Sequence, residues 1–309
     1  MLERFRRATA AVALCAVPCL AFADELADKG RAILEKNKAG VVTVRIVIKM
    51  QMTMQNFPSR EEEMKSEATG TVIDPSGLTV LSLNETDPSG LFEDMTDSRE
   101  GFEVKSSIGD LKILRGDGTE IAAQVVLRDR DLDLAFIRPT EAPKEPLPAV
   151  DFANAAAPAM LDPIVTINRM GRVAGREYAV SLERVSAVVT RPRTFYVMGH
   201  DPTQTSLGCP AFNLDGAAIG LCVMRSIKRG GDSGGFGMFG VGDDNVMAIV
   251  VPAADVLDVA KQAPAAGEEA KELGAEPKEE KTEEKAPEEK APEEKTDGTI
   301  DVKPDAPKA

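Results

Sequence analysis

The chain contains a single histidine, His200, and this restricts the chemistry that it can perform. Histidine is the usual general base of hydrolytic enzymes and a frequent metal ligand, so chemistry of either kind has to pass through His200. Met50, Met52 and Met54 alternate along one predicted strand, a pattern that suits copper(I). No histidine or cysteine is near them in sequence to complete a soft site, so we expect core or edge packing, no metal and no other cofactor.

Two cysteines, Cys209 and Cys222, flank the turn candidate Asn213-Leu214-Asp215-Gly216. This arrangement predicts a hairpin that carries both side chains on one face, directly or diagonally opposed. A disulfide between them and a pair of small buried thiols both fit the sequence.

The first 23 residues predict a cleaved secretory signal peptide. Arg4, Arg6 and Arg7 precede an apolar run from Ala8 to Phe22, and Ala21-Phe22-Ala23 provides a cleavage site. The apolar run is shorter than the roughly 20 residues that a membrane span needs. We therefore expect a periplasmic or secreted protein with no stable membrane span after cleavage, in which a disulfide is chemically permitted.

The composition is that of a globular chain with an acidic balance. The 309 residues carry 37 Lys and Arg against 51 Asp and Glu, a formal charge of −14, which disfavours a nucleic-acid partner. Residues 263–309 alone hold 15 acidic and 8 basic residues and repeat Ala-Pro-Glu-Glu-Lys, with almost nothing to bury. We expect this Glu/Lys/Pro-rich tail to be disordered.

The middle of the chain predicts short strands. A helix and lead-in at residues 24–40 come first, and a final helix at Ala253–Gln262 closes the unit. Strand signals between them alternate with turn residues and are not interrupted by helices, which favours an all-β sandwich or barrel pair. They fall at Val41–Ile48, Thr71–Ile73, Leu78–Leu83, Ile121–Leu127, Leu134–Ile137, Val165–Ile167, Tyr178–Thr190, Ala217–Met224 and Asn245–Val251.

The order of these segments resembles the trypsin-like serine protease domain of the HtrA/Deg family over roughly Val41–Gln262. Five segments carry the resemblance, and they are Gly70–Leu81, Asp131–Ile137, Ser186–Val188, Gly208–Gly220 and Val251–Pro252 with the closing helix. The resemblance implies a trypsin-like double β-barrel, with barrels at about 41–150 and 158–252. The PDZ domain that usually follows in this family is replaced here by the tail.

Of the three positions that correspond to the family's catalytic triad, only one holds the family's residue. Its histidine falls on Asn84, its aspartate on Asp133 and its serine on Leu207, while the oxyanion glycine falls on Thr205. Leucine supplies no nucleophilic atom, and asparagine does not titrate near neutral pH. The resemblance therefore implies a degenerate triad without catalytic residues.

Three rearrangements would restore a nucleophile. Gly231-Asp232-Ser233-Gly234-Gly235 spells the GDSGG signature of trypsin-like enzymes, but it follows the hairpin that already fills the nucleophile position. His200 could form a dyad with Cys209 or Ser233. Ser206 adjoins Leu207, although a shift of one residue redirects its side chain.

The leading hypothesis is an exported, non-catalytic protease homologue that binds a protein or peptide by strand addition. A second hypothesis is an active endopeptidase that uses Ser233, or Cys209 with His200. A third is a structural envelope protein that acts through its acidic tail. The sequence does not fix the identity of the partner or the oligomeric state.

Overall fold

A computed structural model describes residues 25–54, 57–89, 102–199, 207–226 and 246–274. The predicted signal peptide, His200, Thr205, Ser206, Ser233 and residues 275–309 lie outside the described residues. Within the described residues, no helix is long and apolar enough to span a membrane.

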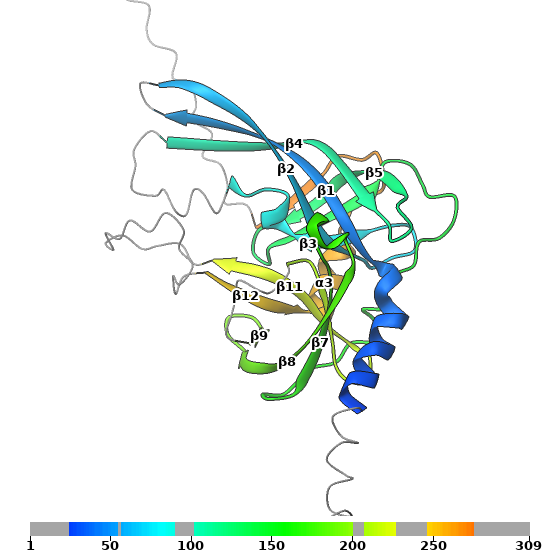
Figure 1. Cartoon of the computed structure of the whole chain (residues 1–309). Coiled ribbons are helices and arrows are strands. Elements are labelled where there is room, and N and C mark those ends of the chain that lie inside the picture. Colours follow the sequence, from blue (N-terminus) through cyan, green and yellow to red (C-terminus); the bar gives the residue numbers. More distant parts are fainter. Residues whose placement is uncertain (1–24, 55–56, 90–101, 200–206, 227–245, 275–309) are drawn as a thin grey trace, which may run out of the picture. The chain divides into compact units, whose positions relative to one another are not determined.

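The first barrel contains six strands in the order β5-β4-β1-β2-β3-β6, and β5 pairs with β6 to close it. The β-branched run at the start of β1 is buried on the barrel side, with Val44 and Ile46 fully buried. Strands β1, β2 and β4 continue well past the barrel as a three-stranded ribbon (Figure 1). The elements are a 3-10 turn at Lys38–Gly40, β1 (Val41–Met54), β2 (Phe57–Val72), β3 (Thr79–Ser82), a 3-10 turn at Leu83–Glu85, β4 (Phe102–Leu114), β5 (Glu120–Asp129) and β6 (Leu134–Pro139).

The second barrel is closed in the order β10-β11-β12-β9-β8-β7. The cluster of Ile164, Cys209, Cys222 and Val250 belongs to its buried core. Its elements are β7 (Pro163–Arg169), a 3-10 turn at Arg172–Ala174, β8 (Tyr178–Val189), β9 (Phe195–Met198), β10 (Pro210–Phe212), β11 (Ala218–Ser226) and β12 (Val246–Pro252), followed by α3 (Ala253–Ala260).

One apolar cluster joins the barrels to the helices. The N-terminal helix, residues 25–37, contributes Ile33, and α3 contributes Val256. Phe136 of the first barrel and Phe212 of the second belong to the same cluster. The predicted all-β double barrel with an N-terminal and a C-terminal helix is therefore confirmed.

The C-terminal residues differ from the prediction of a tail that is disordered from residue 263. Residues 264–274 return to the first barrel, where β13 (Lys271–Leu273) pairs in parallel with β5 at Leu127–Asp129. Partly buried Leu273 packs against the apolar cluster that joins the barrels. The prediction failed here because a three-residue strand among charged residues is specified by the edge that it joins, not by its own composition.

Candidate functional site

The centre of the candidate site is Asp133, the last residue of the turn between β5 and β6. Its backbone has φ +54°, in the left-handed region that residues other than glycine rarely adopt. Strand β3 pairs with β6 so that Ser82 lies opposite Leu134. This register places the Asp133 carboxylate beside the residues that follow β3.

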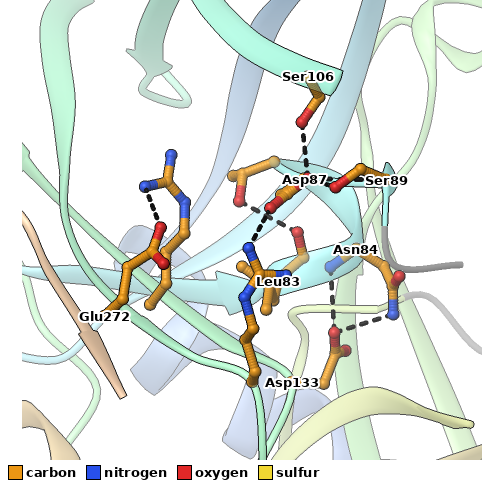
Figure 2. Close-up of polar contacts among 10 residues, drawn as sticks. Leu83, Asn84, Asp87, Ser89, Ser106, Asp133 and Glu272 are labelled. Atoms are coloured by element: carbon orange, nitrogen blue, oxygen red, sulfur yellow. Dashed lines mark hydrogen bonds and ion pairs between the residues drawn. The ribbon is translucent and has the colours of Figure 1, made fainter. Parts of the chain in front are cut away.

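Four donors surround the Asp133 carboxylate. Oδ1 accepts the backbone N–H of Asn84 at 3.1 Å and its side-chain Nδ2 at 2.9 Å. Oδ2 accepts the hydroxyl of Ser82 and, from the second barrel, the backbone N–H of Met224 at 2.9 Å. Figure 2 shows Asn84 directed at Asp133. The carboxylate is therefore saturated, because two oxygens offer about four lone pairs.

Burial is the largest influence on the pKa of the Asp133 carboxyl. Asp133 is 9% exposed, and burial raises its pKa to about 7, assisted by the nearby charge of Glu85. Hydrogen bonds from Ser82, Met224 and Asn84 act in the opposite direction. Burial also raises the pKa of Glu85. Asp133 thus titrates near neutral pH although both of its oxygens are engaged.

A second carboxylate, Asp87, fixes the segment that follows Asn84. Its oxygens accept the hydroxyls of Ser89 and Ser106, the latter at 2.6 Å, and Arg130 at 2.9 Å (Figure 2). Burial raises the pKa of Asp87, but the bonds from Ser106, Ser89 and Arg130 outweigh it and leave the pKa below its ordinary value. The segment is therefore tied both to β4 and to the β5–β6 turn.

Leu207 lies three residues before β10 and is half-buried. The next residue, Gly208, has φ +78°, and a Cβ there would lie 2.1 Å from the Thr69 carbonyl oxygen. Its N–H donates to the Cys222 carbonyl at 2.7 Å, and its carbonyl accepts the Thr71 hydroxyl at 2.9 Å. Only glycine fits this position, because it combines a left-handed backbone with close backbone contact.

Strand β11 brings these positions together. Gly208 bonds to Cys222 and Asp133 bonds to Met224, two residues further along β11. Alternate residues of a strand direct their backbone groups to the same edge, and two residues span about 7 Å. Asp133, with Asn84 bound to it, therefore meets the same edge of β11 as Gly208, the residue after Leu207.

The two cysteines lie opposite each other across β10 and β11. The Cys222 N–H donates to the Cys209 carbonyl at 2.9 Å, which completes a bulge in which Gly208 and Cys209 face Cys222. Both thiols are free and buried in the core of the second barrel. A hydrogen bond with the Cys209 thiol, together with burial, raises the pKa of the Cys222 thiol.

Sequence reasoning missed three groups of the site. Met224 contributes its backbone N–H and Ser82 contributes its hydroxyl. Neither group leaves a recognisable pattern in the sequence. Asp87 had a weak signal, because Asp-Pro-Ser favours a turn in which the aspartate accepts the N–H of Ser89, here at 3.2 Å. Within the described residues, no group of three or more His, Cys, Asp or Glu could hold a metal ion.

The model of the trypsin-like peptidase domain family matches residues 68–221. Among solved structures, a serine endoprotease from Yersinia pestis is 14% identical, with 75% of this chain and 65% of that chain covered and a TM-score of 0.49. The HtrA-type protease AlgW with a tripeptide is 15% identical, with 75% and 62% covered and a TM-score of 0.46.

This chain thus spans less than two thirds of the length of either structure. No curated protein matches the chain. The family match covers β3, β6 and β10, the strands that lead to or from Asn84, Asp133 and Leu207, and it runs into β11. The chain therefore carries a trypsin-like peptidase domain.

Proposed function

We propose that this chain is an exported, non-catalytic serine protease homologue that binds an extended protein or peptide segment along the open edge of β11. The site that accepts the peptide lies at Ser226, two residues beyond Met224, whose N–H is already bound by Asp133. The periplasm or the cell exterior is the proposed compartment, on the basis of the N-terminal sequence.

The proposal that catalysis is lost is supported by the chemistry of the converging positions. Asn84 cannot take a proton from a nucleophile, and its amide is already bonded to Asp133. Leu207 offers no hydroxyl or thiol. Cys209 is 1% exposed, inside the core of the second barrel, where a substrate carbonyl cannot reach it.

The binding proposal rests on residues 224–226 of β11, which on one side have no pairing strand among the described residues. Strand β11 pairs with β12 from Gly220 to Ser226, but its ladder with β10 ends at Leu221. No described strand therefore covers the other side of residues 224–226. Because the Met224 N–H points to that side, the backbone groups of Ser226 do so as well. Such an edge binds an extended peptide through main-chain hydrogen bonds and needs no triad.

A matched pair of variants tests this edge. Peptides selected from a displayed library against the mature chain are measured for binding to Ser226→Pro and to Ser226→Ala. Proline removes the edge N–H, whereas alanine keeps it. We expect Ser226→Pro to weaken binding at least tenfold and Ser226→Ala to bind like the wild type. Equal binding by both variants would exclude strand addition at this edge.

The remaining hypothesis of an active enzyme depends on Ser233, which lies outside the described residues. It predicts labelling by a fluorophosphonate probe that Ser233→Ala abolishes. The binding proposal predicts no labelling of the folded wild type. Labelling of the wild type and of Ser233→Ala therefore tests for activity, and the Ser226 variants test for binding.

A further inference from the structure

The segment after α3 is attached to the first barrel at several points. The Arg138 guanidinium donates to the Pro264 carbonyl at 2.9 Å, and the Lys271 ammonium donates to the Gln262 carbonyl at 3.3 Å. Strand β13 then pairs with β5, and Glu272 lies 3.7 Å from Arg128 (Figure 2). Residues 264–274, hereafter the strap, thus connect the helix behind the second barrel to the first barrel.

Strand β13 occupies a vacant part of the β5 edge. Strand β4 pairs with β5 only at Glu120–Ala122 and then departs into the ribbon. The same side of β5 is therefore open further along, where β13 pairs with Leu127–Asp129. Lys271 and Glu272 are exposed, and partly buried Leu273 provides the apolar contact.

The strap ends against the turn that carries Asp133. The Leu273 carbonyl accepts the N–H of Arg130 at 3.1 Å. Gly274 has φ +70°, and a Cβ there would lie 2.8 Å from Cγ and Oδ1 of Asp131. Arg130 and Asp131 are the first two residues of the turn that ends at Asp133, so the strap contacts this turn directly.

The candidate site holds the same turn from its other side. Arg130 bonds to Asp87, the Asp133 carbonyl accepts the N–H of Leu83 at 2.9 Å, and the Asp133 carboxylate accepts Met224. A turn of four residues has little freedom to absorb displacement at one end without moving the other. The position of Arg130 and Asp131 therefore influences the bond between Asp133 and Met224.

We propose that the β5 edge at Leu127–Asp129 is a second strand-binding site, which this chain fills with its own β13, and that its occupation positions Asp133 against Met224. The site takes a short parallel strand with a carboxylate opposite Arg128 and an apolar residue next to it. Only three residues of β13 pair with β5, and in its ion pair with Arg128 the Glu272 side chain stays 44% exposed, so a segment of the same chemistry can exchange with β13. This inference does not depend on peptide binding at β11.

The test compares two aspartate substitutions in the full chain. Leu273→Asp removes the apolar contact of β13 and adds a charge near Asp129 and Asp131. Ala270→Asp adds the same charge at an exposed position one residue before β13. Amide hydrogen exchange is measured for Arg130, which reports the strap, and for Met224, which reports the site. Val44, in the middle of β1 between two paired strands, reports global opening.

We expect Leu273→Asp to accelerate exchange at Arg130 and Met224 at least tenfold relative to Val44, and Ala270→Asp to match the wild type. A synthetic peptide of residues 264–274, added in excess to Leu273→Asp, should slow both amides again. Gly274→Ala, which keeps Leu273 but crowds Asp131, should also accelerate Met224. The proposal would be overturned if exchange at Met224 relative to Val44 were unchanged in both Leu273→Asp and Gly274→Ala. It would also be overturned if the peptide did not slow exchange in Leu273→Asp.

Discussion

The backbone N–H of Met224 donates to Oδ2 of Asp133 at 2.9 Å, so a buried carboxylate of the first barrel is bound by a strand of the second. The same carboxylate accepts Asn84 and Ser82. Among the described residues, the donors to the Asp133 carboxylate are Asn84, Ser82 and Met224. Asp133 joins the two barrels and fixes the β11 edge that we propose for peptide binding.

Removal of this carboxylate should destabilise the protein. Asp133→Ala leaves the Met224 N–H and the Asn84 amide without their acceptor, so we expect the free energy of unfolding to fall by about 3 kcal/mol. Asp110→Ala, at an exposed carboxylate, should change it by less than about 0.5 kcal/mol. Urea unfolding of both variants measures the difference, and equal stabilities would show that Asp133 does not join the barrels.

The raised pKa of Asp133 predicts an unusual pH dependence. Its pKa is about 7 in the folded protein and 3.8 in the unfolded chain, so between these values the folded state binds more protons. The stability that protonated Asp133 contributes to the folded state is fully present below pH 3.8 and is lost as the pH rises through 7. From pH 5 to pH 8, the wild type should lose stability relative to Asp133→Asn, which does not titrate.

Asp87→Asn provides the control for that measurement. The pKa of Asp87 is lowered, so its stabilisation is present above 3.8 and is lost only as the pH falls through its folded value. Between pH 5 and pH 8, Asp87→Asn should have the same slope of stability against pH as the wild type. If the wild type, Asp133→Asn and Asp87→Asn all showed the same slope of stability against pH, the titration could not be assigned to Asp133.

The loop before β10 should tolerate no side chain at Gly208. In Gly208→Ala, a Cβ 2.1 Å from the Thr69 carbonyl adds a backbone clash to the cost of the left-handed conformation, so we expect a loss of about 3 kcal/mol or more. Gly118→Ala has a similar φ of +85° but nothing within 4 Å, and should cost about 1 kcal/mol. Chemical denaturation of the two variants tests this ranking, which a similar cost for both would refute.

The two thiols should be unreactive in the folded, reduced protein. Cys209 and Cys222 are buried, and the pKa of Cys222 is raised, so little thiolate is present or accessible. We expect Ellman's reagent to detect no thiols in the folded, reduced mature chain after removal of the reductant, and both thiols once that sample is denatured. Rapid reaction of Cys209 before unfolding would revive it as a candidate nucleophile. A mass lower by about 2 Da in non-reduced material would identify the disulfide that the sequence left open.

The sequence predicted the parts of the fold that depend on local pattern. The β-branched run of β1 was found because its composition specifies a strand, and the aspartate before β6 was found through the family resemblance. Strand β2 was missed along most of its length, because Ser59–Glu67 is charged and polar and is a strand only through its pairing with β1.

The candidate site was predicted in its positions but not in its contacts. The family resemblance assigned Asn84, Asp133 and Leu207, whereas the donors from Ser82 and Met224 depend on register between distant strands. The strap had no sequence signal, because the opening in the β5 edge that it fills arises only where β4 leaves the barrel.

The most direct test of the central claim is active-site labelling of the mature chain. Purified, folded Asp24–Ala309 is treated with a fluorophosphonate probe, and casein digestion is followed in parallel, with Ser233→Ala as the matched control. We predict no labelling and no digestion by either protein. Labelling of the wild type that Ser233→Ala abolishes would contradict the loss of the nucleophile and restore a working protease.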